Sequence, residues 1–231
     1  MHRYKYLFEQ VVSFENVLAA ALEALRGKRW CEPGASFYAD LERRVVDLQA
    51  ELSGEVYRPG EYHYFRIHEP KERLVVAAPF RDGVVHHAIV RVIQPIFERR
   101  FIEDAYASHP GKGTHAAMRR ASQFARRFDY ALKCDVQKYF PSIEHGVLMF
   151  LVSRVIGDDR LLTLMTKVLE THHDLVRQEW SSGGDFFEVR LRKCGLPIGN
   201  LTSQFFANVY LNSLDHFVKH ELRLKEQAQR V

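Results

Sequence analysis

One carboxylate at the end of a largely apolar stretch is well placed to do chemistry. Asp135 follows residues 130–134, which have strand-like composition, and the aromatic residues Tyr139 and Phe140 come within the next five positions. A carboxylate beside a turn can hold Mg²⁺, a hard cation that prefers oxygen ligands, and the main-chain carbonyl of Val136 can add a second ligand. The alternative is that Asp135 is only a turn residue that ends a strand.

A turn rich in glycine and proline is the second candidate feature. Residues 195–199 read Gly-Leu-Pro-Ile-Gly and precede a predicted helix that begins with polar side chains. Gly199 has no side chain, so a sugar or a base can approach its backbone closely. The free amides at the N-terminus of a helix favour an anion. The alternative is a simple loop in which Asn200 caps the helix.

Basic residues are concentrated in one part of the chain. Residues 91–128 contain eight Lys and Arg against three Asp and Glu, a net charge of +5, whereas the whole chain carries +4. A basic segment on a near-neutral body suggests a polyanionic partner such as nucleic acid. A solvated helix face explains the same charges without any partner.

The composition excludes several classes of protein. A hydrophobic content of 46% and a charged content of 27% are typical of a globular protein. The longest apolar stretch, residues 146–152, is too short to span a bilayer, and the first ten residues do not resemble a secretory signal. The three cysteines form no Cys-x-x-Cys pair, which favours a reducing, cytoplasmic setting away from membranes.

Helices and strands alternate irregularly in the predicted order of elements. Apolar periodicity and turn signals predict helices over residues 5–29, 36–53, 82–100, 114–127, 141–156, 160–171 and 199–224, with Asp82 and Thr114 as caps. Strands are predicted over residues 62–68 and 73–78, which form a hairpin, over 130–135, and over 175–180 and 186–191, which form a second hairpin. Because strict βαβ alternation is missing, the predicted fold class is α+β.

Taken together, the two candidate motifs resemble the A and B sequence blocks of reverse transcriptases, in the right order and at a fitting distance. Residues 71–75 lie where that family has its fingers hairpin, and residues 79–115 resemble its next block. The resemblance covers nearly the whole chain. It implies the fingers and part of the palm of a right-hand polymerase, with an N-terminal helical extension over residues 1–55, fingers over 56–128 and a partial palm over 129–231.

The second block also resembles one particular branch of the family. Most reverse transcriptases have a Gln-Gly pair followed by Ser-Pro, whereas this chain has Ile198-Gly199 followed by Ser203-Gln204. That pattern resembles the enzymes of diversity-generating retroelements, which copy a template RNA into cDNA with errors at adenines and work with a small basic accessory protein. Retron and abortive-infection enzymes are the alternatives.

The resemblance implies a role for each matching residue. Asp135 would be the catalytic, metal-binding carboxylate, aided by the Val136 carbonyl, in a mechanism with two Mg²⁺ ions: one activates the primer 3′-hydroxyl and the other holds the triphosphate. Phe140 would act as a steric gate that excludes the ribose 2′-hydroxyl, although core packing also explains an aromatic residue there. Lys71 and Arg73 would bind the triphosphate through charge-assisted hydrogen bonds, although both also suit a solvated hairpin tip.

The remaining implied contacts involve the nucleotide pocket and the nucleic-acid backbone. Ile198, Gly199 and Gln204 would shape the pocket for the nucleotide and the template base. Phosphates of an RNA template and of a DNA or RNA primer would bind the basic helix, through Lys112, Arg119, Arg120, Arg126 and Arg127. The expected substrates are dNTPs.

One departure from the family pattern is important. The Tyr-x-Asp-Asp hairpin that supplies the other two carboxylates in that family has no counterpart in the sequence. A single Asp does not hold two Mg²⁺ ions in a reactive arrangement, so the chain alone is expected to be inactive as a polymerase. The alternative function is a non-catalytic module, built on a degraded polymerase scaffold, that binds RNA or docks a partner. The retained Asp135 and Phe140 favour the polymerase.

Overall fold

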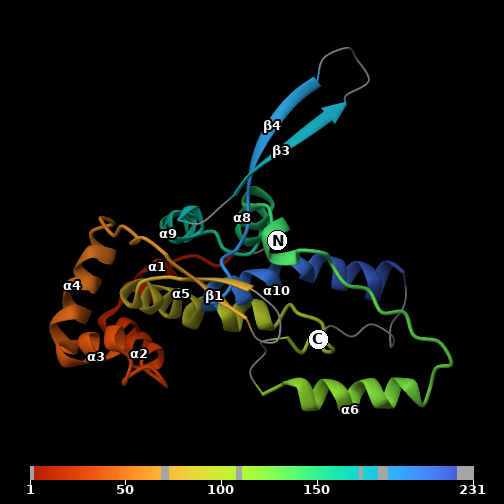
Figure 1. The fold of residues 1–231 in the computed structure, drawn as a ribbon, viewed down its shortest axis with the longest axis horizontal. Helices are drawn as coiled ribbons and strands as arrows, with labels where there is room; N and C mark the ends of the chain where they lie inside the picture. Colours follow the sequence, from red (N-terminus) through yellow and green to blue (C-terminus); the bar gives the residue numbers. More distant parts are fainter. Residues whose placement is uncertain (1–2, 69–72, 108–110, 172–173, 182–186, 223–231) are drawn as a thin grey trace.

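The computed structural model describes residues 3–68, 73–107, 111–171, 174–181 and 187–222. Within these ranges, helices and two antiparallel hairpins are mixed along the chain (Figure 1). The helices are α1 (Phe8–Val12), α2 (Phe14–Ala24), α3 (Glu32–Ala39), α4 (Leu41–Ser53), α5 (Phe80–Glu98), α6 (Thr114–Ala125), α7 (Tyr139–Ser142), α8 (His145–Ser153), α9 (Asp159–Glu170) and α10 (Leu201–His216), which continues into the π-helical turn η1 (Phe217–Glu221). The hairpins pair β1 (His63–Ile67) with β2 (Arg73–Ala77), and β3 (Asp174–Ser181) with β4 (Phe187–Cys194).

Helix α5 lies at the centre of the hydrophobic core. It packs against α2 on one side and α10 on the other, and the hairpin β3–β4 projects away from this helical body (Figure 1). The buried side chains of α5 include Val85, Ile89 and Ile93. Full burial of each such side chain contributes about 1.5–3 kcal/mol. Because the core also includes residues from α1, α4, α8 and α9, one packed body connects all three predicted regions of the chain.

The first predicted helix, residues 5–29, is divided into α1 and α2. Ser13 has an extended backbone (φ −60°, ψ 143°), and its hydroxyl accepts a hydrogen bond from the Asn16 amide at 3.3 Å. The residues before α1 are bound far along the chain, because the Asp158 carboxylate accepts from the amides of Leu7 and Phe8 at 2.8 and 2.9 Å. The Tyr4 amide also donates to the Val155 carbonyl at 2.9 Å.

The prediction that Asp82 caps a helix is wrong. Helix α5 begins at Phe80, and Asp82 lies inside its first turn with a relative exposure of 2%. Its carboxylate accepts hydrogen bonds from the Tyr57 hydroxyl at 2.8 Å and from the Gly60 amide at 2.7 Å. Burial, together with the Asp82 charge, raises the pKa of Tyr57, so this hydroxyl stays protonated and donates. Asp82 therefore fixes the turn that leads into β1.

The prediction of a strand over residues 130–135 is also wrong. Residues 130–136 have no regular secondary structure, and no backbone hydrogen bond joins residues 129–137 to another part of the described chain. The side chains of Tyr130 and Leu132 are 95% and 90% exposed. The segment runs along the edge of the molecule between α6 and α7 (Figure 1). A strand forms only where a neighbour pairs with it, and the described residues supply none.

Other predicted helices also differ from the structure. The helix predicted over residues 36–53 is divided into α3, which begins earlier, and α4, because Asp40 between them has a non-helical backbone (φ −130°, ψ 39°). Gly113 is the N-cap of α6, so Thr114 is its first helical residue and does not cap it. The predicted helix over residues 141–156 is divided into α7 and α8, because Ile143 is extended and Glu144 pairs with Cys194 in an antiparallel bridge. The predicted helix over residues 199–224 begins at Leu201 as α10. None of the helices in the described ranges combines the length and the apolar character that crossing a membrane requires.

Candidate nucleotide and nucleic-acid site

The two sequence motifs are joined directly by hydrogen bonds. The Leu196 amide donates to the Phe140 carbonyl at 3.0 Å, and the Gly195 amide donates to the Ile143 carbonyl at 2.9 Å. The His145 Nε2 atom lies 2.7 Å from the Gly195 carbonyl oxygen. The segment that follows Asp135 therefore lies alongside the Gly-Pro turn, although more than fifty residues separate them in the sequence.

Strand β2 lies against the same turn. The Val76 amide donates to the Ile198 carbonyl at 3.1 Å. Gly199 has a φ of +123°, which favours glycine, and a Cβ atom there would lie 3.3 Å from Val75 Cγ1 and 3.5 Å from the Val76 oxygen. Because Gly199 has no side chain, β2 can therefore lie close to the backbone of the turn.

A hydrogen-bonded polar pair, which sequence reasoning missed, connects the same elements; Asn200 is buried and Tyr62 is partly buried. Asn200 is 7% exposed, and its Nδ2 donates to the Tyr62 hydroxyl oxygen at 3.0 Å. The Thr171 Oγ1 atom lies 3.3 Å from the same oxygen. Burial raises the pKa of Tyr62, and the hydrogen bonds from Thr171 and Asn200 partly oppose this. In the sequence, Asn200 is recognisable only as a helix cap and Tyr62 only as a strand residue.

Asp135 and Val136 are both exposed. The Asp135 carboxylate forms no hydrogen bond or ion pair with any other described residue, so its oxygens are available to a cation. The donor set fits one edge of a Mg²⁺ site: a carboxylate and, one residue later, a main-chain carbonyl. It does not fit two ions, because no cluster of three or more His, Cys, Asp or Glu side chains suitable for a metal is present among the described residues.

Phe140 and Ile198 differ in their surroundings. Phe140 is partly buried against the core, with its ring 5.8 Å from that of Tyr139 in an edge-on arrangement, and the Tyr139 hydroxyl donates to the Ala207 carbonyl at 2.6 Å. Ile198 is 38% exposed at the surface of the turn. Arg73 begins β2, where it pairs with Ile67, whereas Lys71 lies outside the described residues.

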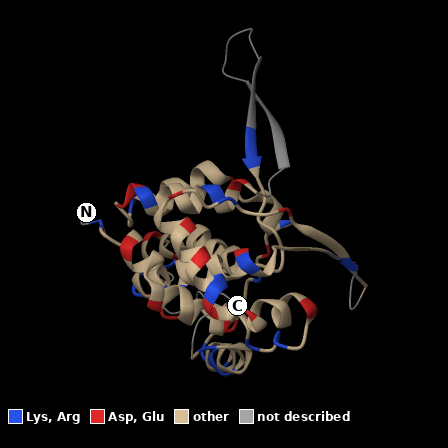
Figure 2. Cartoon of the chain, turned by 90° about the vertical axis from the view of Figure 1, so that its left-hand side faces the viewer, with Lys and Arg blue, Asp and Glu red and all other residues tan. Residues whose placement is uncertain are grey.

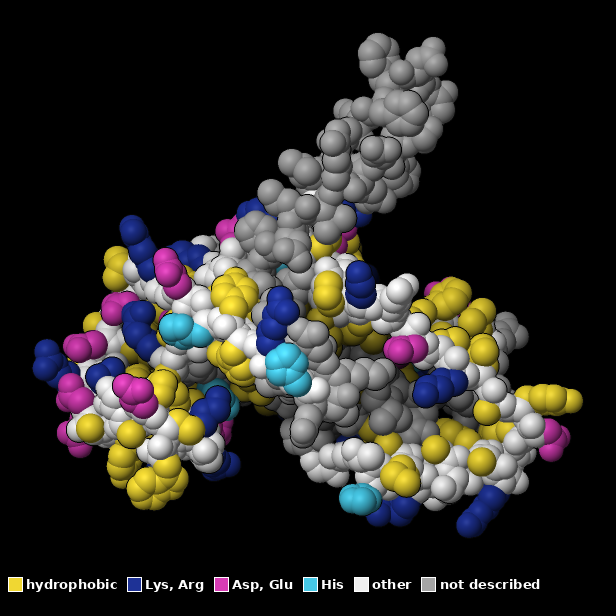
Figure 3. Space-filling view, viewed as in Figure 1, with side chains coloured by type: hydrophobic (Ala, Val, Ile, Leu, Met, Phe, Trp, Pro, Cys, Tyr) yellow, Lys and Arg dark blue, Asp and Glu magenta, His cyan; other side chains and the backbone are white. Residues whose placement is uncertain are grey.

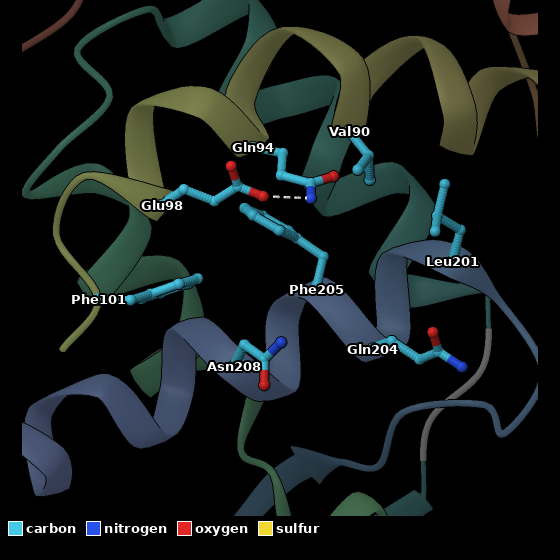
Figure 4. A pocket seen from close by; sticks show the side chains of 8 residues that line it. All are labelled: Val90, Gln94, Glu98, Phe101, Leu201, Gln204, Phe205 and Asn208. Carbon is cyan, nitrogen blue, oxygen red and sulfur yellow. Dashed lines mark hydrogen bonds between the residues drawn. The ribbon is translucent and has the colours of Figure 1, made fainter. Parts of the chain in front are cut away.

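Gln204 lines a separate small hollow between α5 and α10 (Figure 4). Phe205 projects into this hollow towards the hydrogen-bonded pair of Gln94 and Glu98, and the Gln204 amide points away from that pair. The hollow has a volume of about 30 Å³, which holds one or two water molecules and excludes a base. The described structure therefore does not bring Gln204 together with Ile198 in a single pocket.

A neutral histidine lies under the first turn of α10. His86 is buried, and its Nδ1 atom lies 3.4 Å from the Thr202 hydroxyl oxygen. Burial, with a smaller effect of His87, lowers the pKa of His86 to about 4. His86 therefore carries no charge at pH 7 and adds no cation to the amides at the start of α10.

Two of the five predicted phosphate-binding residues, Lys112 and Arg120, are held by polar contacts with the loop before α6. Arg120 forms an ion pair with the buried Asp104, with N–O distances of 2.8 and 3.4 Å, and its guanidinium lies 4.6 Å from the centre of the Phe124 ring. Lys112 lies over the ring of Tyr106 at 5.3 Å and donates to the Ala105 carbonyl at 3.3 Å. These contacts attach α6 to the loop before it.

The other three basic residues are exposed: Arg119 is on α6, and Arg126 and Arg127 directly follow it. Arg119 and Arg126 are exposed and line a shallow hollow with His115, Met118, Ser122 and Gln123, while Arg127 lies 5.5 Å from the ring centre of Phe128. Helix α6 contains no Asp or Glu, and its arginines are visible at the lower edge of the molecule (Figure 2). In the space-filling view, basic side chains and a histidine project from this edge (Figure 3).

Several curated proteins are similar to this chain, although no protein-family model matches it. Protein YkfC of Escherichia coli is 28% identical over 200 residues, which cover 81% of this chain and 49% of YkfC. The group II intron-encoded protein LtrA of Lactococcus lactis is 24% identical over 192 residues, covering 82% of this chain and 30% of LtrA. Nuclear intron maturase 1 of Arabidopsis thaliana is 26% identical over 91 residues, covering 39% of this chain and 13% of the maturase.

These relatives include group II intron-encoded proteins and intron maturases, which are related to reverse transcriptases. The similarity supports a reverse transcriptase-like family for the chain, in agreement with the resemblance of its sequence blocks. It gives no support to the diversity-generating branch. The chain spans about half the length of YkfC and less than a third of LtrA.

Proposed function

We propose that the chain forms the fingers and the first part of the palm of an RNA-directed DNA polymerase. The observation that carries this proposal is the direct contact of three segments that the family resemblance singles out: the residues after Asp135, the turn at 195–200 and strand β2. Polar and charged groups from the fingers and the palm can meet one nucleotide only if these segments are adjacent. The similarity to intron-encoded proteins supports RNA as the template.

Asp135, with the Val136 carbonyl, would hold Mg²⁺ at this site. When bound, Mg²⁺ lowers the pKa of the primer hydroxyl and neutralises charge on the triphosphate. The exposed carboxylate, which has no partner among the described residues, supports this role. Because one carboxylate does not hold two ions, the site needs acidic side chains beyond those described, and we expect no nucleotide incorporation by this chain alone.

The other residues of the site would bind and orient the substrates. Arg73 begins the strand that leads to Val76 and would approach the triphosphate from the fingers. The partly buried ring of Phe140 would face the sugar, and Ile198 would contact the base without a directional hydrogen bond. Within the family, Ile198 and the Ser203-Gln204 pair support the diversity-generating branch, with its small basic accessory protein as a partner.

A ternary-complex assay tests the proposed function without requiring catalysis. The purified chain is bound to a primed RNA template whose primer ends in a dideoxynucleotide, and dissociation is measured by fluorescence anisotropy. In the presence of Mg²⁺, the dNTP complementary to the templating base is expected to slow dissociation at least about threefold, because pairing adds contacts to the complex. A non-complementary dNTP is expected to have no effect.

An equal response to all four dNTPs, or no response, would contradict the polymerase proposal. RNA binding without any nucleotide effect would favour the non-catalytic RNA-binding module. The exposed arginines of α6 are the specific observation that supports this second function, because they suit phosphate binding whether or not catalysis occurs.

The position of Arg119 and Arg126 leads to a second prediction. Replacing both with Ala is expected to weaken binding of primed RNA and to reduce the slope of log Kd against log salt concentration by about 1.4, because each phosphate contact to a single strand contributes about 0.7. Filter binding between low and moderate salt measures this slope.

The matched control for this variant removes two arginines elsewhere. Arg43 on α4 and Arg154 after α8 are both exposed, so Arg43→Ala with Arg154→Ala makes the same change in net charge. We expect the slope of log Kd against log salt concentration for this control to equal that of the wild-type chain within experimental error. Equal slopes for the two double variants would exclude phosphate contacts by α6.

A further inference from the structure

Asn200 contacts both strands of the fingers hairpin at its base. Its Nδ2 donates to the hydroxyl oxygen of Tyr62, which directly precedes β1. Its Oδ1 accepts from the amide of Ala78, which directly follows β2, at 3.5 Å. One buried side chain in the turn at 195–200 therefore holds the two ends of the hairpin.

The contacts around this side chain support one another. The Val76 amide binds the Ile198 carbonyl two residues before Asn200, and Thr171, directly after α9, holds the Tyr62 hydroxyl from another direction. A buried amide that loses its partner costs about 1–3 kcal/mol, so the arrangement specifies one position of the hairpin base.

A small movement at the hairpin base would be amplified at its tip. Arg73 and Ala78 are five residues apart, which corresponds to about 17 Å along a strand. A rotation of about 10° at the base would therefore displace the backbone of Arg73 by about 3 Å, more than the tolerance of a charge-assisted hydrogen bond to phosphate.

We propose that Asn200 and Tyr62 are positioning residues, which set the distance between the fingers hairpin and the turn that carries Ile198, and so define the nucleotide pocket. This inference rests on the proposed function, because the pocket is the one in which a dNTP would bind. Neither residue touches the nucleotide. They act through the orientation of β2 relative to the turn.

The first experiment measures the position of the hairpin directly and needs no substrate. Hydrogen exchange of the intact chain is followed by mass spectrometry for peptides that cover residues 73–78. Tyr62→Phe removes a single oxygen, and Asn200→Ala removes both side-chain hydrogen bonds. We expect each variant to increase amide exchange of this segment roughly tenfold. In Asn200→Ala the Ala78 amide loses its acceptor, and in both variants the hairpin base is held less firmly, so that the Val76 amide separates more often from the Ile198 carbonyl.

The second experiment measures the consequence for the nucleotide. In the ternary-complex assay described above, each variant is expected to raise the half-saturating concentration of the complementary dNTP roughly five- to tenfold. The affinity for primed RNA without dNTP is expected to stay unchanged, which a general loss of structure would not produce. The double variant is expected to have a half-saturating dNTP concentration no higher than that of the more affected single variant, because the two residues act as one unit.

The matched control is Asn16→Ala in the helical body. The Asn16 Nδ2 also donates two hydrogen bonds, to the carbonyls of Val11 and Ala88 at 2.9 and 3.0 Å, far along the chain from the turn. This variant is expected to lower the stability of the protein. Amide exchange at residues 73–78 and the half-saturating concentration of the complementary dNTP are expected to stay unchanged.

The outcomes separate the inference from the proposed function. Unchanged exchange in Tyr62→Phe and Asn200→Ala would overturn the positioning role. The positioning role would also be overturned if the wild-type chain responds to the complementary dNTP and both variants respond equally well. A wild-type chain with no dNTP response would instead contradict the polymerase proposal, while the exchange experiment would still decide whether the pair positions the hairpin.

Discussion

Replacing Asp135 with Asn is expected to raise the half-saturating concentration of the complementary dNTP about 100-fold in the Mg²⁺-dependent ternary-complex assay. A 100-fold change corresponds to about 2.7 kcal/mol. Asn has the shape of Asp but lacks its charge, and a neutral amide oxygen is a much weaker ligand for Mg²⁺ than a carboxylate. Because Asp135 is exposed and has no partner among the described residues, the substitution should leave the fold unchanged.

Asp129→Asn is the matched control for this prediction. Asp129 lies in the same segment without regular secondary structure and is also exposed, so the control changes the same charge at a neighbouring place. We expect it to leave the dNTP dependence within about twofold of wild type, since long-range charge effects are screened by salt. Equal effects of the two substitutions would show that Asp135 contributes only general charge and is not a metal ligand.

Replacing Asp82 with Ala is expected to lower the free energy of unfolding by about 2–5 kcal/mol. The substitution removes the acceptor of two buried donors, the Tyr57 hydroxyl and the Gly60 amide, and each unsatisfied donor costs about 1–3 kcal/mol. Urea unfolding followed by circular dichroism measures the change, and Asp82→Asn, which keeps one acceptor oxygen, is expected to lose less.

Asp47→Ala provides the control on the protein surface. Asp47 is exposed on α4, and its contact with Arg43 at 3.8 Å is solvated, so its removal is expected to change stability by less than about 0.5 kcal/mol. A loss below 1 kcal/mol in Asp82→Ala would mean that solvent replaces the lost acceptor and that Asp82 does not fix the turn before β1.

Local patterns in the sequence were sufficient to predict the two hairpins and the start of α9. Both hairpins form where alternation and turn residues predicted them, and α9 begins within one residue of its predicted start. The family resemblance implies that the Phe140 segment lies beside the turn at 195–200. Sequence spacing alone could not predict this contact, because residues 144 and 194 pair only in the tertiary fold.

Features that depend on distant partners were not predictable in the same way. A strand-like composition at residues 130–135 is not sufficient for a strand, because a strand forms only when a neighbouring segment pairs with it. Asp82 has the sequence context of a cap, and only the folded chain brings Tyr57 to its carboxylate. Asn200 and Tyr62 are 138 residues apart, so no periodicity connects them.

The attachment of residues 4–8 to residues 155–158 has a consequence for biosynthesis. The amides of Leu7 and Phe8 reach their acceptor only after Asp158 has left the ribosome, and the loop that this contact closes contains about 150 residues. Helix α2 can pack against α4 and α5 before that, because both of these helices precede Asp158 by more than fifty residues. The segment before α1 is therefore expected to join the packed helices late, because a contact that closes so long a loop forms slowly.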